Sequence, residues 1–384
     1  MADTEGVASR QLALDALARI DDDGAYANLV LSGVLDRPGP GGAALSTHDK
    51  GFVTDLVYGT VRMQRALDFL VDRFLTSDPP PAARRALRLG AYQLAFRDDL
   101  PDYAVVSATV SASPKRFRGL VNAVLRKVAT ASVDYPDDAT RLSYPDWIVE
   151  QLSSDLGEQD ALEALAAMDR APSVHRRDDG YVQDLASQWV AALVGAQAGE
   201  LVADLCAAPG GKATAMAATG ATVVAADLNP VRVGLISTNA HTVHSPALFP
   251  VVADGLVAPF RPGSFDRVLL DAPCSGLGVL RRRADARWRI DQEAPARLGT
   301  LARRLIDAAV PLVRPGGTLV FSVCTLTASE SMAVDDHIAS THPALEPLPP
   351  PSDPWRPWGR GAILLPQVAD TDGMCLFRYR VPAA

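Results

Sequence analysis

The second half of the chain carries short β-prone runs separated by stretches long enough for helices. Each run is rich in valine, leucine or alanine, and the runs are residues 201–205, 222–227, 247–254, 266–273 and 317–323. Nearly continuous apolar strands that are bracketed by turn residues and joined through helices are typical of βαβ units around a parallel sheet. The sequence therefore predicts a doubly wound α/β domain over residues 181–384.

The N-terminal third shows a different period. Apolar side chains recur at three- and four-residue spacing, as in residues 52–74, which is the pattern of amphipathic helices. Stretches rich in proline and glycine at residues 37–42 and 77–82 should stop helices and divide the region into five or six short ones. We predict an all-α domain over residues 1–135 and a helical linker over residues 136–180.

Composition excludes several classes of protein. With 48% hydrophobic and 21% charged residues, this chain of 384 residues can bury a sizeable core, so it is neither disordered nor fibrous. No segment approaches the ~20 apolar residues that span a bilayer, and the N-terminus lacks a signal-peptide pattern, so we expect a cytoplasmic protein without membrane contact. The net charge of −8 means that a polyanion would have to bind at a local patch.

The cysteines are expected to be reduced thiols. Cys206, Cys274, Cys324 and Cys375 form no CxxC pair and have no histidine at ligand spacing. This arrangement indicates neither a disulfide framework nor a metal site.

Residues 204–212 (DLCAAPGGK) follow the first predicted strand and open a helix. Glycines in such a turn let the backbone approach a ligand closely. The spacing is neither that of GxGxxG nor that of a P-loop, so we expect a nucleotide-like cofactor other than a dinucleotide or ATP. Asp227 ends the second strand, where it can accept hydrogen bonds from ribose hydroxyls, and Asp254 ends the third, where it can meet an adenine edge. Each aspartate could instead be a helix N-cap.

Three motifs resemble, in order and spacing, those of the RsmB/Nop/Sun family of S-adenosylmethionine-dependent RNA cytosine-5 methyltransferases. They are residues 204–212, residues 271–289 (DAPCSGLGVLRRRADARWR) and residues 321–326 (FSVCTL), and residues 364–380 also fit the family's C-terminal pattern. In the N-terminal third, three stretches resemble the NusB-like RNA-binding domain of the family's bacterial branch. They are residues 49–62, 87–96 and 121–127.

The resemblance implies a Rossmann-like methyltransferase core preceded by an all-α NusB-like domain. It also implies S-adenosyl-L-methionine as the cofactor and RNA as the partner, with small-subunit (16S) ribosomal RNA as the substrate. We expect a monomer that needs no metal ion.

Methylation at cytosine C5 requires activation of the ring, because C5 is a weak nucleophile until a thiolate adds to C6. The resemblance assigns that thiolate to Cys324 and assigns a role in resolving the adduct to Cys274. Asp271 could hydrogen-bond or protonate cytosine N3 as charge builds on the ring. Cys206 is expected to contribute only its backbone, and Cys375 is expected in the core.

The cofactor site draws on several strand ends. Lys212 is expected to meet the methionine carboxylate or a neighbouring acid, and Arg232 is expected either to pack on the adenosine or to remain solvated. The predicted cofactor-binding residues are Cys206, Ala207, Ala208, Pro209, Gly210, Gly211, Lys212, Asp227, Arg232, Asp254 and Asp271.

Two basic segments are candidate RNA contacts. Residues 280–289 hold five arginines and one aspartate, together with Trp288 as a stacking surface, and residues 113–127 hold basic residues without an acid. The alternatives are a buried Trp288 with arginines that pair with acids, and a solvated helix face. The predicted RNA contacts are Arg281, Arg282, Arg283, Arg287, Trp288, Lys115 and Arg116.

The chain departs from the family pattern in two places. Residues 171–184 leave no room for the small α/β RNA-binding subdomain that usually precedes the core, and Val323 and residues 328–331 (ASES) differ from the usual nucleophile motif. Two other functions stay open: a non-catalytic RNA-binding or assembly factor that retains the fold, and a methyltransferase that acts on transfer RNA or another RNA. The presence of both Cys274 and Cys324 favours catalysis.

Overall fold

The computed structural model describes residues 2–36 and 44–383, and the chain divides into two compact units. The first unit comprises Met1–Val149 together with Arg283–Arg289, and the second comprises the remaining segments. Of the residues predicted to form a helical linker, those up to Val149 belong to the helical unit and the rest belong to the α/β unit.

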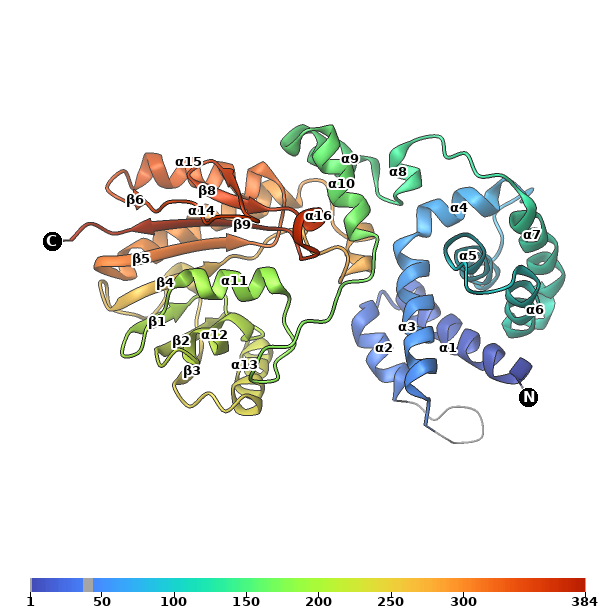
Figure 1. Cartoon of the computed structure of the whole chain (residues 1–384), viewed down its shortest axis with the longest axis horizontal. Helices are drawn as coiled ribbons and strands as arrows, with labels where there is room; N and C mark the ends of the chain where they lie inside the picture. Colours follow the sequence, from blue (N-terminus) through green and yellow to red (C-terminus); the bar gives the residue numbers. More distant parts are fainter. Residues whose placement is uncertain (1, 37–43, 384) are drawn as a thin grey trace. The chain divides into compact units, whose positions relative to one another are not determined.

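The first unit is all-helical over its long elements, as predicted (Figure 1). It has more helices than expected. The apolar period continues across Met63 and predicts one helix there, but the backbone of Met63 leaves the helical region and separates two helices. The predicted break at residues 77–82 is present, and the one at residues 37–42 lies outside the described residues. The helices are α1 (Ala2–Asp22), α2 (Ala27–Leu35), α3 (Thr47–Arg62), α4 (Gln64–Asp72), α5 (Pro81–Phe96), α6 (Asp102–Ala112), α7 (Arg118–Thr130) and α8 (Asp138–Arg141), with a 3-10 turn η2 (Lys115–Phe117).

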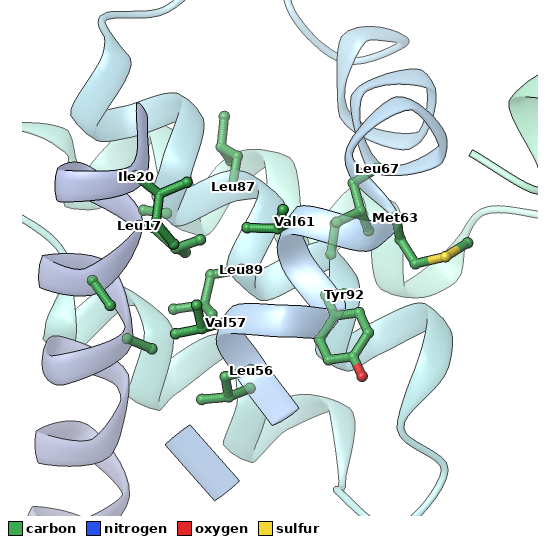
Figure 2. Packing of buried hydrophobic residues seen from close by; sticks show 14 of the residues in the cluster. Leu17, Ile20, Leu56, Val57, Val61, Met63, Leu67, Leu87, Leu89 and Tyr92 are labelled. Atoms are coloured by element: carbon green, nitrogen blue, oxygen red, sulfur yellow. The ribbon is translucent and has the colours of Figure 1, made fainter. Parts of the chain in front are cut away.

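The core of this unit lies between α1, α3 and α5 (Figure 2). Leu17, Leu56 and Leu89 are buried there, one from each helix. A Cβ atom at Gly59 would lie 1.9 Å from Cζ of Tyr92, so only glycine lets α3 approach α5 this closely. The phenol of Tyr92 then donates a hydrogen bond back to α3.

Residues after α7 are held to α4 by Arg65. Its Nη1 donates to the carbonyl of Tyr144 at 2.8 Å, and its Nε donates to Oγ1 of Thr140 at 3.1 Å. The backbone N–H of Arg65 donates to Oγ of Ser143 at 3.0 Å. These bonds explain why the start of the predicted linker packs within the helical unit.

The segment Arg283–Arg289 packs in the helical unit although it follows the Cys274 loop in sequence. Arg287 is fully buried, and its guanidinium carbon lies 3.8 Å from the ring centroid of Tyr144. Its Nη1 donates to the carbonyls of Ser143 at 3.1 Å and Arg62 at 3.3 Å. The prediction that Arg287 contacts RNA phosphates is therefore wrong, because its guanidinium is bound inside this unit.

Trp288 ends the 3-10 helix η4 (Ala284–Trp288) and is half-buried against the same core. Its indole Nε1 donates to the carbonyl of Val61 at 2.8 Å. The structure shows the indole packed against this core and partly exposed, and a base-stacking role for Trp288 stays a prediction.

The second unit is built on one mixed sheet, for which the described residues give nine strands in the order β3-β2-β1-β4-β5-β9-β8-β7, with β6 beside β9. All five predicted strands form, and they are parallel, whereas the C-terminal strands are antiparallel and were not predicted. The strands are β1 (Leu201–Asp204), β2 (Thr222–Asp227), β3 (Leu248–Val252), β4 (Phe265–Asp271), β5 (Val313–Val323), β6 (Glu346–Pro347), β7 (Arg356–Trp358), β8 (Gly361–Leu364) and β9 (Met374–Arg380).

Helices cover both faces of this sheet, with α11 to α13 on one side and α14 and α15 on the other (Figure 1). The strand order reverses between β1 and β4, and ligands of open α/β sheets bind outside the carboxyl ends of strands at such a reversal. No described helix of either unit is long and apolar enough to cross a membrane. The helices are α9 (Asp146–Leu156), α10 (Glu158–Met168), α11 (Leu185–Val194), α12 (Gly211–Ala217), α13 (Pro230–Thr242), α14 (Ala294–Ala309), α15 (Met332–Thr341) and α16 (Pro366–Ala369).

Replacing Arg287 by alanine should lower the free energy of unfolding of the helical unit by about 2–4 kcal/mol, because two buried carbonyls lose their donor and Tyr144 loses its cation. Urea denaturation of the full chain measures this change. Arg283→Ala, at an exposed neighbouring position, is the control and should change the free energy by less than about 0.5 kcal/mol. An Arg287→Ala variant with wild-type stability and weakened RNA binding would restore the discarded assignment.

Candidate active site

The carboxyl ends of β4 and β5 bring the two predicted catalytic thiols together. Sγ of Cys274 lies 3.3 Å from Sγ of Cys324, although the two residues are far apart in sequence. At the end of β4, Oδ2 of Asp271 accepts a hydrogen bond from Nζ of Lys212 at 2.7 Å, and Oδ1 accepts one from Oγ of Ser322 at 2.6 Å. Of the two partners expected for Lys212, the structure shows the neighbouring acid.

Two groups that neighbour Cys324 have shifted pKa values. A hydrogen bond to Cys324, burial and the nearby charge of Cys324 raise the pKa of Cys274 well above its usual value, so Cys274 keeps its proton. Burial alone would lower the pKa of Lys212, but the charge and hydrogen bond of Asp271, with a contribution from Cys324, outweigh burial and raise it. A thiol that holds its proton and an ammonium group therefore both act on the sulfur of Cys324.

The cofactor loop between β1 and α12 is braced by neighbouring strands and helices. The N–H of Ala208 points to Oδ2 of Asp227 at 3.4 Å, and the carbonyl of Ala208 accepts from Nη2 of Arg232 at 2.9 Å. Gly210 has φ +105°, and a Cβ atom there would lie 3.2 Å from Cγ2 of Ile236. Glycine is required at this turn because both its dihedral angle and its surroundings disfavour a side chain.

Backbone groups of this loop are also tied to β2 and α13. The N–H of Ala207 donates to the carbonyl of Ala226 at 2.9 Å, and the carbonyl of Pro209 accepts from Nδ2 of Asn239 at 2.9 Å. Burial and the charge of Asp204 raise the pKa of Cys206, which keeps this thiol protonated. These hydrogen bonds hold the loop against β2 and α13.

Arg177 is a brace that sequence reasoning missed. Its Nη1 donates to the carbonyl of Gly211 at 2.6 Å, its Nη2 donates to Oγ1 of Thr214 at 3.0 Å, and it forms an ion pair with Asp179. The short segment that stands where the family usually has a subdomain thus secures the first turn of α12. A signal was present in the sequence, since Arg177 lies only a few residues before the start of the core.

Asp204 was also not singled out, yet it is the most strained acid of the site. It is 1% exposed, and among the described residues its Oδ1 has no hydrogen-bond partner. Burial and the charge of Asp271, opposed by Lys212, raise the pKa of Asp204 to about 8. A buried acceptor without a donor in a ligand crevice indicates that a donor comes from the ligand.

The other two strand-end aspartates have local backbone partners. Oδ1 of Asp254 accepts from the N–H of Leu256 at 2.9 Å and caps the 3-10 turn η3 (Gly255–Val257), which is the N-cap alternative. Oδ1 of Asp227 accepts from the N–H of Asn229 at 3.0 Å, and Asn229 itself caps α13. Asp227 is 4% exposed, so it shapes the loop whether or not it also meets a ligand.

Two arginines predicted to contact RNA are held in ion pairs, Arg281 in a buried position and Arg282 with 28% of its side chain exposed. Arg281 is 1% exposed and donates to Oδ1 of Asp370 at 2.7 Å and to Oδ1 of Asp372 at 3.0 Å. Arg282 donates to Oδ2 of Asp184 at 2.7 Å and also pairs with Asp372. The prediction for Arg281 is wrong, because its guanidinium is buried among these acids, whereas RNA contact by the partly exposed Arg282 stays a prediction.

Other basic residues remain on the surface. Arg283, Lys115 and Arg116 are exposed, and the guanidinium carbon of Arg116 lies 4.6 Å from the ring centroid of Phe117. Cys375, in contrast, is fully buried, and its Sγ points to the carbonyl of Thr325 at 3.4 Å. Burial raises the pKa of Cys375 to about 12, as expected for a core thiol.

Comparison with known proteins agrees with this geometry. Residues 191–378 match the family model for 16S rRNA methyltransferase RsmB/F, and residues 7–130 match the NusB family. Ribosomal RNA small subunit methyltransferase B of Thermus thermophilus is 35% identical over 88% of this chain and 89% of that protein. The probable ribosomal RNA small subunit methyltransferase B of Bacillus subtilis is 29% identical over 97% of this chain and 98% of that protein.

A solved structure supports the architecture. The crystal structure of PH0851 aligns with a TM-score of 0.76 and 20% identity over 98% of each chain. An all-helical region followed by this α/β sheet confirms the predicted fold class, that of the S-adenosylmethionine-dependent methyltransferases. The chain belongs to the RsmB/F family of RNA cytosine methyltransferases and carries a NusB domain on its N-terminal side.

The residues of the crevice fit the cofactor on which this family depends. S-adenosylmethionine bears a sulfonium and an ammonium group, and the unpartnered Oδ1 of Asp204 is a buried acceptor for such a cation. Asp227 and Asp271 add two further carboxylates whose charges act on Asp204, while Lys212 is the one cation among the groups that shift its pKa. The excess of negative charge suits a ligand whose net charge is positive.

Replacing Asp204 by asparagine should stabilise the free protein at alkaline pH. The folded-state pKa is about 8, against 3.8 for an ordinary aspartate, so between these pH values the folded chain holds a proton that the unfolded chain has released. The free energy of unfolding therefore falls as pH rises from about 4 to about 8. Asp204→Asn should add about 1–3 kcal/mol at pH 8 and less at pH 5, measured by urea denaturation.

Asp254→Asn is the matched control, since asparagine keeps a capping oxygen, and it should change the free energy of unfolding by less than about 0.5 kcal/mol without this pH dependence. Asp204→Asn should also bind S-adenosylmethionine at least about ten-fold more weakly by calorimetry above about pH 8, where Asp204 is ionised, because asparagine offers a cation no charged acceptor. An unchanged stability difference between pH 5 and pH 8 would contradict the raised pKa of Asp204.

Proposed function

We propose that this chain methylates C5 of a cytosine in small-subunit ribosomal RNA, with S-adenosylmethionine as the methyl donor and Cys324 as the nucleophile. The observation that carries the proposal is the 3.3 Å contact between the sulfurs of Cys274 and Cys324, beside the ion pair of Lys212 with Asp271. Two thiols in contact at the ends of adjacent strands suit a reaction in which one adds to a ring and the other assists its release.

The first step is addition of the Cys324 thiolate to cytosine C6. The C5–C6 π electrons move onto C5 and are shared through C4 with N3, so C5 becomes nucleophilic and N3 gains electron density. A proton passes from solvent through the carboxyl group of Asp271 to N3 and returns by the same route when the adduct is released, while Lys212 and Ser322 hold both oxygens of that carboxyl group in place. When bound, S-adenosylmethionine supplies an electrophilic methyl group to C5.

The second step releases the product. The C5 proton passes to water, its electron pair restores the C5–C6 double bond, and the electrons of the C6–S bond return to Cys324. Cys274, whose pKa is raised by its hydrogen bond to Cys324 and by burial, donates its S–H to the departing sulfur. The roles of the two thiols differ because only one of them keeps its proton.

Support for a ribosomal substrate comes from the relatives and from the helical unit. Both relatives described above are named as small-subunit ribosomal RNA methyltransferases, and the helical unit matches the NusB family. We assign Lys115, Arg116 and Arg283 as candidate RNA contacts, since all three are exposed. The target cytosine must be unstacked for C6 to reach a thiol, which favours a loop or incompletely assembled RNA.

Methyl transfer from labelled S-adenosylmethionine tests the proposal. The substrate is deproteinised small-subunit RNA from a strain that lacks this protein, and 5-methylcytosine should appear at one position. Cys324→Ala should lose at least about 10³-fold in rate, because no adduct forms without the thiolate. Cys274→Ala should accumulate a covalent protein–RNA complex that resists denaturing electrophoresis.

Cys375→Ala is the matched control, because it removes a buried core thiol that touches neither Cys274 nor Cys324, and it should retain near wild-type methyl transfer. Label in transfer RNA but not in small-subunit RNA would reject ribosomal RNA as the substrate and leave the proposed cysteine mechanism in place. No label in any RNA, together with measurable cofactor binding, would favour a non-catalytic RNA-binding factor.

A further inference from the structure

Glu330 is a buried carboxylate that the mechanism above does not use. It is 1% exposed and ends the 3-10 turn η6 (Ala328–Glu330), which follows the Cys324 loop. Burial raises the pKa of Glu330, and hydrogen bonds from Ser275, Thr327 and Thr325 oppose this rise. Burial of a carboxylate costs free energy unless hydrogen-bond donors surround it, so the elements that supply those donors are informative.

The donors to Glu330 come from both thiol loops. Oε1 accepts from the backbone N–H of Ser275 at 2.6 Å, and Oε2 accepts from Oγ of Ser275 at 2.6 Å. Oε2 also accepts from Oγ1 of Thr325 at 3.0 Å and from Oγ1 of Thr327 at 2.7 Å. Ser275 directly follows Cys274, and Thr325 directly follows Cys324. One carboxylate is therefore bonded to the residue next to each thiol.

Glu330 itself stands on a fixed element. The N–H of Ala328 donates to Oδ2 of Asp155 at 2.9 Å, and Oγ of Ser331 donates to the carbonyl of Thr327 at 2.6 Å. These bonds anchor η6 on both sides of the carboxylate. A displacement of Glu330 must therefore move both thiol loops and cannot be absorbed by a flexible turn.

We propose that Glu330 is a positioning residue that keeps the sulfurs of Cys274 and Cys324 in contact, so that attack by one is followed by release through the other. The consequence for catalysis rests on the function proposed above. The geometric part stands by itself, since it concerns two sulfurs 3.3 Å apart and one carboxylate between their loops. A misplacement of about 1 Å at a reacting pair can cost about 10²-fold in rate.

The charge of Glu330 also acts on the thiol pair, through the pKa of Cys274. It contributes, after the hydrogen bond to Cys324, burial and the charge of Cys324, to the raised pKa of Cys274. A neutral side chain at this position would both loosen the two loops and make the Cys274 proton easier to lose. Glutamine is the informative substitution, because it keeps the volume of glutamate and removes the charge and one acceptor.

The test uses thiol oxidation in the full chain without RNA or cofactor. Diamide takes two electrons and two protons from a pair of thiols, which become a disulfide while its N=N bond becomes a hydrazine. In the wild type, the linked peptide that joins Cys274 to Cys324 should form rapidly, as followed by mass spectrometry after quenching. Glu330→Gln should form it at least about ten-fold more slowly.

Asp335→Asn is the matched control. Asp335 is also a 1% exposed carboxylate, and it accepts hydrogen bonds from the N–H of Arg360 at 3.0 Å and from the hydroxyl of Tyr379, away from both thiols. This variant should cross-link at the wild-type rate even if its thermal stability falls. Should Glu330→Gln fail to fold, Ser275→Ala replaces it, and an intermediate slowing is expected because only one of two bonds from Ser275 is lost.

Wild-type cross-linking in folded Glu330→Gln, or equal slowing in Asp335→Asn, would overturn the proposal. With RNA present, Glu330→Gln should lower kcat by about 10²-fold and leave the Kd for S-adenosylmethionine unchanged. Slow cross-linking in Glu330→Gln alone, combined with no methyl transfer by the wild type, would support the positioning role and reject the proposed function. The two hypotheses therefore fail separately.

Discussion

The ion pair of Lys212 with Asp271 joins the two halves of the active site. Lys212 stands in the first turn of α12 beside the cofactor loop, and Asp271 ends β4 directly before the Cys274 loop. The cofactor loop and the Cys274 loop are therefore linked through one ion pair. The charge of Asp271 is balanced by Lys212, whose pKa burial alone would lower. Asp204 remains unbalanced beside this pair, which leaves the crevice ready for a positively charged ligand.

Sequence alone predicted the elements whose pattern is local. Strands β1 to β5 were found because strands buried on both faces must be apolar throughout, and the positions of the loops at their carboxyl ends followed from the parallel topology. The antiparallel β7 to β9 were not predicted, since β7 is short and lies within a proline-rich stretch whose strand pattern is weak. The division of α3 from α4 was missed because the helical period runs on across Met63.

Partners that are distant in the sequence explain the remaining errors. Arg287 carries a charge that composition reveals, but its carbonyl partner Ser143 lies 144 positions earlier. Glu330 stands in a hydroxyl-rich stretch, yet its role depends on Ser275, 55 positions earlier. An arginine-rich run therefore indicates RNA only after its acids and carbonyls are known, and here Asp184, Asp370 and Asp372 lie outside the run they neutralise.

The helical unit is discontinuous in sequence, and this affects how the chain is made. Residues up to Val149 leave the ribosome long before Arg287 and Trp288 are made. Arg287 donates hydrogen bonds to the carbonyls of Arg62 and Ser143, and Trp288 donates one to the carbonyl of Val61. During synthesis the N-terminal helices must therefore wait, with these carbonyls uncovered, until most of the α/β unit has been translated. Completion of the N-terminal unit is then a late event in folding, despite its early place in the chain.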